Sequence, residues 1–239
     1  MTFCEQELPR ALQNRLELTH FGTQFGVSGA LRNGWLVTTT THRVRIVGVS
    51  GSLSVPSRTT ALVDAVAREF AKPLDASVEI IELGSLVGAL AGTSRSALGP
   101  EATAALTAVE AADVIVVGSP AYRAAYTGIF KHFFDFVGQY ALVDKPIVLT
   151  ATGGSDRHAL LVEHQMRPLF GFFQALTLPL GIFATETDFE NYQIISDELT
   201  ERIALSTQRT IGLLNSQLGT SGRFGSTEIV ERSLHPSSF

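Results

Sequence analysis

Hydroxyl side chains and one arginine are concentrated in a short segment in the first quarter of the chain. Residues 48–60 read GVSGSLSVPSRTT. The side chains in it that could bind an anion include Ser50, Ser52, Ser57, Arg58 and Thr59. Hydroxyls and a guanidinium bind phosphate well, and a helix N-terminus adds backbone amides and the positive end of its dipole. The segment is therefore either a phosphate-binding loop or a polar loop in which Ser57 simply caps the next helix.

This segment matches neither of two common nucleotide-binding patterns. It lacks the Gly-Lys-Ser/Thr of the P-loop and the G-x-G-x-x-G of dinucleotide-binding folds. Phosphate binding here would therefore have to rest on hydroxyls, amides and Arg58.

Two further segments have residue types that can lie against a planar ligand. In GSPAYRAAYTG, residues 118–128, Pro120 stiffens the backbone and Tyr122 and Tyr126 add aromatic surface. In TATGGSDRH, residues 150–158, two adjacent glycines allow the backbone to approach a ligand closely. The alternatives are that the tyrosines only pack over a sheet edge and that the glycines form an ordinary strand-to-helix turn.

The elements between these segments must position them. Short apolar, β-branched runs alternate with amphipathic helical patterns, which indicates strands and helices in turn. The predicted strands are residues 44–49, 78–83, 114–117, 147–150 and 178–184. The predicted helices are residues 57–71, closed by Pro73, then 100–112, 129–137, 160–176, interrupted by Pro168, and 196–214.

This alternation predicts an α/β fold, a doubly wound three-layer sandwich around a five-stranded parallel sheet in the order 2-1-3-4-5. Ligands of such sheets bind beyond the carboxyl ends of the strands, at the switch point between strands 1 and 3. The three segments follow strands 1, 3 and 4, so the topology predicts that they form one site. In that site the chemistry divides into a phosphate end and a ring end.

Composition argues against several other classes of function. The net charge is −5, the pI is about 5.7 and Lys and Arg are not clustered, so a nucleic-acid partner is not expected. No membrane partner is expected either, because no run approaches the roughly 18 apolar residues of a membrane helix. The absence of a secretory pattern and the single Cys4 favour a cytoplasmic setting. His132 and Asp135 are too few ligands for a metal site.

The two ends of the chain have no regular pattern. Residues 1–42 are predicted to be an N-terminal extension that is flexible, in contact with another subunit, or an artefact of the choice of start codon. Residues from about 216 to 239 are rich in serine and glycine, and we expect a disordered tail. The domain itself is predicted to span residues 43–215.

The motifs quoted above resemble those of the NAD(P)H-dependent FMN reductases of two-component flavin monooxygenase systems. GSLSVPSRTT, SPAYRAAYTG and ATGG carry this resemblance, and it covers about residues 43–214. Residues 158–194 are similar to the reductases that serve alkanesulfonate and methanesulfonate monooxygenases. The resemblance implies a flavodoxin-like fold, FMN and NAD(P)H as cofactors, and a homodimer or homotetramer. It also implies a separate flavin-dependent monooxygenase that receives reduced FMN.

The resemblance also assigns residues to the flavin site. It places Ser50, Ser52, Ser57, Arg58 and Thr59 on the phosphate loop, Pro120, Ala121, Tyr122 and Arg123 around the flavin ring, and Thr152, Gly153 and Gly154 on the third loop. It further implies a π-bulge at Tyr126 that shapes the nicotinamide site. Related loops often have an arginine where this chain has Leu53 and Ser54, so we expect one phosphate contact to be missing.

The expected chemistry belongs to the cofactors, because hydride passes from nicotinamide C4 to flavin N5. We therefore predict no catalytic acid or base among the side chains, and Arg123 is a candidate to neutralise charge on the pyridine nucleotide. Two alternatives are a quinone or azo reductase that retains FMN and a non-enzymatic electron carrier of the flavodoxin type. The modest net charge and Arg123 argue against the carrier. The sequence does not choose between NADH and NADPH.

Overall fold

β-branched residues form the centre of the sheet. The computed structural model describes residues 27–32, 35–40 and 43–221. Strand β3 (Arg45–Ser50) is buried from Ile46 onward, as expected of a parallel strand covered on both faces. It pairs with β4 (Ser77–Glu82) on one side and β5 (Val114–Pro120) on the other. β5 in turn pairs with β6 (Pro146–Gly153), and all of these pairings are parallel.

The far edge of the sheet has two short strands where one was predicted. β7 (Leu176–Thr177) pairs with the start of β6 and β8 (Ile182–Thr185) with its end. Pro179 lies between them and has no N–H to donate to the ladder, which explains the break. The resulting order, β4-β3-β5-β6 followed by β7 and β8, confirms the predicted order 2-1-3-4-5. This is the flavodoxin-like arrangement that the resemblance implies.

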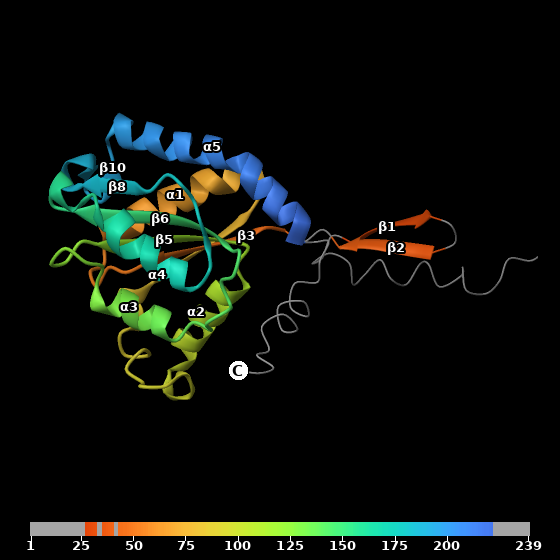
Figure 1. The fold of residues 1–239 in the computed structure, drawn as a ribbon, viewed down its shortest axis with the longest axis horizontal. Coiled ribbons are helices and arrows are strands. Elements are labelled where there is room, and N and C mark those ends of the chain that lie inside the picture. The colour runs from red at the N-terminus through yellow and green to blue at the C-terminus, as the bar shows by residue number, and fades with distance from the viewer. Residues whose placement is uncertain (1–26, 33–34, 41–42, 222–239) are drawn as a thin grey trace, which may run out of the picture. The chain divides into compact units, whose positions relative to one another are not determined.

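Helices cover both faces of this sheet (Figure 1). On one face, α1 (Arg58–Leu74) and α5 (Asp197–Ser221) pack over a cluster that includes Val63, Phe70 and Leu214. On the other face lie α2 (Pro100–Ala111), α3 (Gly128–Asp135) and α4 (Arg167–Phe172). Their core is aromatic: the rings of Phe130 and Phe170 each lie 4.9 Å from that of Phe134. Two packed cores thus hold the strand ends in place.

Local signals set the ends of the helices. Ser57 caps α1, because its Oγ accepts the N–H groups of Thr59 and Thr60 at 3.1 and 3.4 Å. Pro73 does not close α1 but lies within its last turn, and Asp75 ends the helix with a φ of 46°. α5 continues to Ser221, so the predicted disordered tail begins too early at residue 216. Leu218 packs against the core and explains the longer helix. The rest of that tail lies outside the described residues.

The predicted π-bulge at Tyr126 is wrong. Thr127 is extended, and its Oγ1 accepts the N–H of Phe130, so that α3 begins only at Gly128 and runs as a regular α-helix. The π-helical segment lies after β6, at Val162–Met166, and leads directly into α4. The backbone N–H of Arg167 donates a hydrogen bond to the carbonyl of Val162, five residues earlier in the chain. Pro168 follows at once, and its missing N–H removes the bond that an α-helix would make to His164.

Short elements complete the chain. Single turns occur at Leu83–Leu86, Arg95–Ala97, Asp156–His158 and Glu186–Asp188, and β9 (Phe189–Glu190) pairs with β10 (Gln193–Ile194) after β8. Within the predicted N-terminal extension, β1 (Val27–Arg32) and β2 (Trp35–Thr40) form a separate antiparallel pair. The remainder of residues 1–42 lies outside the described residues.

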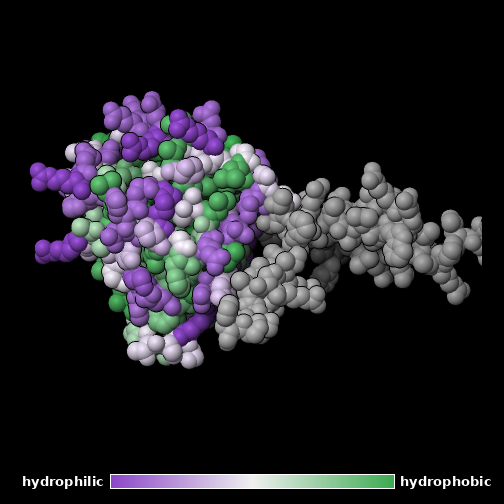
Figure 2. Space-filling view, in the orientation of Figure 1, coloured by the Kyte–Doolittle hydropathy of each residue, from purple (hydrophilic) through white to green (hydrophobic). Residues whose placement is uncertain are grey.

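The surface of the domain mixes polar and apolar residues. In Figure 2, hydrophilic residues interrupt the hydrophobic ones across the face shown. Among the helices of the described residues, none is both long and apolar enough to cross a membrane.

Candidate active site

The carboxyl ends of β3, β5 and β6 border a cavity of about 320 Å³. It brings together residues from all three segments that the sequence singled out. The predicted site residues that line it are Ser52, Ser57, Arg58, Thr59, Pro120, Ala121, Tyr122, Thr152, Gly153 and Gly154. The cavity therefore lies where the topology places a ligand, at the switch point of the sheet.

Hydrogen bonds join the three loops to one another. Thr59 Oγ1 lies 2.6 Å from Thr152 Oγ1, and both side chains are buried. The amide of Ala121 donates to the carbonyl of Thr152 at 2.7 Å. The Thr127 hydroxyl donates to the carbonyl of Gly51, also at 2.7 Å. These bonds fix the loops relative to one another before a ligand binds, which lowers the entropy cost of binding.

One end of the cavity lies at the N-terminus of α1. The hydroxyls there already have partners, since Ser57 caps the helix and Ser52 accepts the amide of Ser54 at 3.1 Å. The guanidinium of Arg58 lies 3.0 Å from Glu186 Oε1, and this ion pair faces solvent. The positive end of the helix dipole, the hydroxyls and Arg58 suit a phosphate group.

The other end of the cavity is lined by backbone and by Tyr122. A tight turn follows Pro120 and Ala121, in which the amides of Tyr122 and Ala125 donate to each other's carbonyls at 2.9 and 3.1 Å. A Cβ added to Gly154 would meet nothing within 4 Å, so the backbone is open to a ligand there. Flat backbone, an aromatic side chain and amides are suited to the face and polar edge of a planar ring.

A sequence profile described as NADPH-dependent FMN reductase matches residues 44–190, which is more than half of the chain. The chain belongs to this family. It is therefore an oxidoreductase whose cofactors are FMN and NAD(P)H.

Individual relatives agree with this assignment. The reductase is 46% identical to the NADH-dependent FMN reductase SfnF of Pseudomonas fluorescens, over 73% of this chain and 94% of that protein. It is 43% identical to the FMN reductase (NADPH) of Pseudomonas aeruginosa, over 74% of this chain and 96% of that protein. Among solved structures, an oxidoreductase of Corynebacterium diphtheriae matches with a TM-score of 0.65 and 33% identity, over 74% of this chain and 97% of the other.

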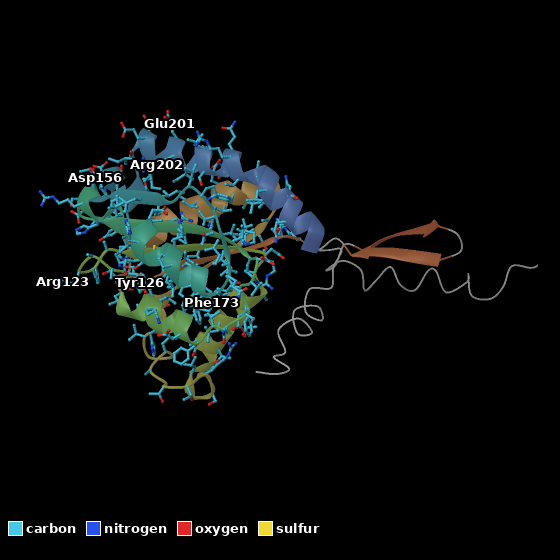
Figure 3. All side chains as sticks on the ribbon, viewed as in Figure 1. Arg123, Tyr126, Asp156, Phe173, Glu201 and Arg202 are labelled. Carbon is cyan, nitrogen blue, oxygen red and sulfur yellow. The ribbon has the colours of Figure 1, made fainter. Side chains whose placement is uncertain are left out.

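Three predicted site residues do not line the cavity of the reductase. Ser50 is fully buried, and its Oγ accepts the hydroxyl of Thr60 at 2.9 Å beneath the start of α1. Arg123 lies on the exposed turn after Pro120, at the edge of the domain (Figure 3). Tyr126 packs inward, with its ring 5.6 Å from that of Phe130.

Sequence reasoning missed the contribution of the loop after β8. Thr185, Glu186 and Tyr192 line the same cavity, in addition to Ser54 and Pro56 of the first loop. β8 ends at the same edge of the sheet as β3, β5 and β6, because these strands are parallel. The segment after the fifth predicted strand could therefore have been included on topology alone.

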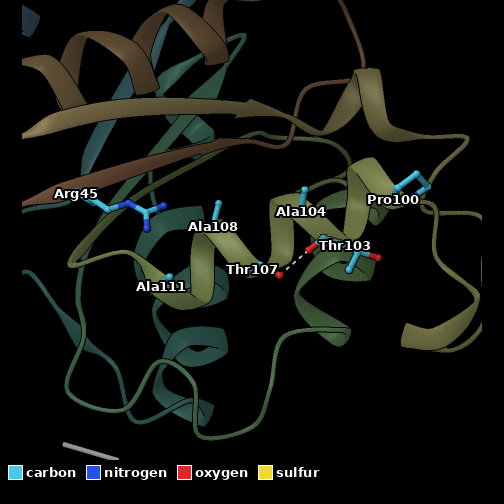
Figure 4. A pocket seen from close by; sticks show the side chains of 7 residues that line it. All are labelled: Arg45, Pro100, Thr103, Ala104, Thr107, Ala108 and Ala111. Carbon is cyan, nitrogen blue, oxygen red and sulfur yellow. Dashed lines mark hydrogen bonds between the residues drawn. The ribbon is translucent and has the colours of Figure 1, made fainter. Parts of the chain in front are cut away.

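A larger hollow of the reductase, of about 540 Å³, lies away from these loops (Figure 4). Its lining residues are Arg45, Pro100, Thr103, Ala104, Thr107, Ala108 and Ala111. Apart from Arg45 at the start of β3, its lining residues all belong to α2, and none belongs to the loops after β3, β5, β6 and β8. Its larger volume alone does not identify it as the active site.

The residues of the smaller cavity fit FMN at both ends. A helix N-terminus with Arg58 suits the phosphate, and the backbone of Pro120, Ala121, Gly153 and Gly154 suits the ring. The end that suits a phosphate also has a negative side chain, Glu186, which is paired with Arg58.

Proposed function

We propose that this chain reduces FMN with NAD(P)H in this cavity and releases the reduced flavin to a separate flavin-dependent monooxygenase. The observation that carries the proposal is the meeting of the three predicted loops, together with the loop after β8, at one hollow beyond the strand ends. The family assignment supports the reductase activity. The resemblance of residues 158–194 to the reductases of sulfonate monooxygenases supports the delivery.

In this proposal the first loop binds the phosphate of FMN. Arg58 supplies the positive charge, and the backbone amides at the start of α1 supply donors with the dipole behind them. Ser52, Ser57 and Thr59 line the hollow and complete a polar wall. Ser50 acts from below, since it holds Thr60 and so fixes the first turn of α1.

The second and third loops bind the ring. Pro120, Ala121 and Tyr122 lie along one side, with Thr152, Gly153 and Gly154 on the other, and the bond from Ala121 to Thr152 keeps the two sides in register. Arg123 is placed to meet the charged groups of NAD(P)H outside the cavity. When bound, FMN would supply the redox chemistry, with its N5 as the acceptor of hydride from NAD(P)H, and these loops would hold and orient it. The protein contributes the relative position of the two reactants.

The exposure of the site supports exchange of FMN in place of permanent retention. The side chain of Arg58 is 40% exposed, and Tyr122 is 50% exposed. Water and salt ions compete with a phosphate for groups that are this exposed. The phosphate is therefore bound less tightly than it would be in a closed pocket.

A steady-state assay tests this proposal. Purified protein freed of flavin is mixed with NADH or NADPH, with and without added FMN, FAD and riboflavin. We expect oxidation of the nicotinamide to depend on added FMN, and flavin to separate from the protein in gel filtration. Protein that stays yellow through the column and reduces quinone without added flavin would instead be an FMN-retaining quinone or azo reductase. Failure to oxidise either nucleotide with FMN in excess would support the electron carrier.

Delivery needs its own test. The reductase is combined with a purified alkanesulfonate or methanesulfonate monooxygenase, FMN, NAD(P)H and substrate. We expect sulfite release from alkanesulfonate, or product formation from methanesulfonate, at a rate set by the supply of reduced FMN. A chemical source of reduced flavin that works while this enzyme does not would contradict the proposal.

We also propose that the face around α4 contacts a second copy of the chain. Leu160 and Phe172, on either side of Val162–Met166, are 63% and 64% exposed. Burial of such side chains in an interface stabilises it by the hydrophobic effect. Light scattering on the protein and on Phe172→Ser checks this, since the variant should shift towards monomer.

A further inference from the structure

An ion pair lies at the end of the cavity where we place the phosphate. Arg58 Nη2 lies 3.0 Å from Glu186 Oε1, although the two residues are 128 positions apart in sequence. Arg58 is the first residue of α1, and Glu186 opens the turn after β8. Both side chains belong to the lining of the cavity. The carboxylate of Glu186 is therefore already paired with the guanidinium that an incoming phosphate would use.

The loop holds Glu186 in this place. Thr185 and Asp188 form a capping box, in which the amide and hydroxyl of Thr185 lie 2.6 and 2.9 Å from Asp188 Oδ2. This box fixes the turn Glu186–Asp188 at the mouth of the cavity. The Glu186 oxygen that contacts Arg58 Nη2 is a negatively charged acceptor, as an oxygen of a phosphate would be. Glu186 is thus an internal substitute for the anion.

The charges that line the cavity agree with this role. Of the lining side chains in the described part of the chain, Arg58 carries the positive charge and Glu186 the negative one. Their sum is zero, whereas the phosphate of FMN carries between one and two negative charges at neutral pH. A phosphate that displaces Glu186 from Arg58 then lies near an unpaired carboxylate and is repelled by it.

We propose that Glu186 sets the affinity for FMN by competing with the flavin phosphate for Arg58. This inference rests on the proposed function, in which FMN binds with its phosphate at α1 and leaves after reduction. Glu186 is here a specificity-determining residue. It lowers the affinity for FMN but not the affinity for flavins that lack a phosphate. It forms its ion pair with Arg58 again when FMN leaves. The competition keeps the flavin exchangeable without any loss of contacts to the ring.

Flavin binding to the full chain tests the proposal. Dissociation constants for FMN and for riboflavin, which lacks the phosphate, are measured by flavin fluorescence at low and high salt. The proteins are the wild type, Glu186→Gln, Arg58→Ala and the double variant. Glu190→Gln is the matched control, because Glu190 is exposed, lies four residues further on and does not line the cavity.

We expect Glu186→Gln to tighten FMN binding by about three- to tenfold at low salt, and less at high salt. Riboflavin binding should not change, and neither flavin should respond to Glu190→Gln. Arg58→Ala should weaken FMN alone. In the Arg58→Ala background the gain from Glu186→Gln should shrink, because the competed group is gone.

The outcomes separate the two proposals. If Arg58→Ala weakens FMN but Glu186→Gln leaves it unchanged, the phosphate placement stands and the competition is wrong. An equal response of FMN and riboflavin to Glu186→Gln would also overturn the competition, since the effect would not involve the phosphate. If Arg58→Ala and Glu186→Gln both leave FMN unchanged, the phosphate lies elsewhere and both proposals fail.

Discussion

The hydroxyl oxygens of Thr59 and Thr152 lie 2.6 Å apart in the lining of the cavity at the strand ends. Thr59 belongs to the first turn of α1 and Thr152 to the end of β6, so this one bond joins the first loop of the site to the third. Both residues are more than nine-tenths buried. Valine has nearly the same shape as threonine but no hydroxyl, so a change to valine on either side tests this bond.

Thr152→Val should therefore destabilise the protein. The change leaves the buried hydroxyl of Thr59 without this partner, at a cost of about 1–2 kcal/mol in the free energy of unfolding. It should also raise the KM for FMN, because the two ends of the site lose their link. Urea denaturation and steady-state kinetics measure the two effects.

The double variant Thr59→Val/Thr152→Val provides the control. It removes both hydroxyls together, so it should cost less than the sum of the two single changes. Strictly additive losses would show that the hydroxyls do not interact in solution.

Gly118 and Gly154 have different surroundings: the first is closely packed, and the second has open space beside it. A Cβ at Gly118 would lie 2.6 Å from Thr150 Oγ1 and still closer to Val63, whereas one at Gly154 would meet nothing within 4 Å. Gly118→Ala should cost about 1–3 kcal/mol in the free energy of unfolding. Gly154→Ala should leave stability nearly unchanged but weaken flavin binding, because the new methyl group stands between backbone and ring. Thermal melts and flavin titrations on both variants check this, and normal flavin affinity in Gly154→Ala would exclude close approach there.

The turn beside Tyr122 should become more stable with glycine. Arg123 and Ala124 have φ values of 52° and 66°, which disfavour any residue with a Cβ. Ala124→Gly relieves this strain, so the free energy of unfolding should rise by up to about 1 kcal/mol, partly offset by the flexibility of glycine in the unfolded chain. Ala124→Val should lower it. A loss of stability in Ala124→Gly, measured by urea denaturation, would contradict the assigned turn.

Much of the site could be predicted because its residues lie close together in sequence. The loops after β3, β5 and β6 are each marked by local composition, and the parallel topology brings their ends to one edge. The pairing of Arg58 with Glu186 has no such local signal, since the residues are 128 positions apart and meet only through the sheet. Long-range contacts of this kind depend on both topology and loop geometry. The sequence pattern predicts the topology but not the geometry of the loops.

The errors also have physical causes. The serine and glycine content after Leu214 indicated disorder, but a single apolar residue, Leu218, gives that stretch a surface to pack on. The bulge was assigned to Tyr126, yet the cap at Thr127 stops any helix from including that residue. The distortion falls instead on Val162–Met166, where Pro168 follows. The proline was recognised as a helix breaker, but a register shift in the turn before it was not predicted.

The π-helical segment leads to a further prediction, on pH dependence. Arg167 donates hydrogen bonds to Glu163, with Nη2 to Oε1 at 2.8 Å, and these bonds lower the pKa of the Glu163 carboxyl below its ordinary value. A lowered folded pKa means that the pair contributes stability above the unfolded pKa and loses it as the pH falls through the folded one. The Glu163 side chain is 46% exposed, so solvent screening limits the contribution to about 0.5 kcal/mol.

Glu163→Gln should therefore be less stable than the wild type by up to about 0.5 kcal/mol near pH 7, and the difference should shrink towards zero as the pH falls below about 4. Arg167 keeps its bond to the carbonyl of Leu178, at 3.0 Å, so the variant should retain the fold of the segment. Urea denaturation of both proteins across this pH range measures the difference. The matched variant Glu201→Gln, at an exposed position beyond the first turn of α5, shows the change expected from net charge. A gap between wild type and Glu163→Gln that stays constant with pH would mean that the stability difference does not depend on ionisation of the Glu163 carboxyl, and it would contradict this prediction.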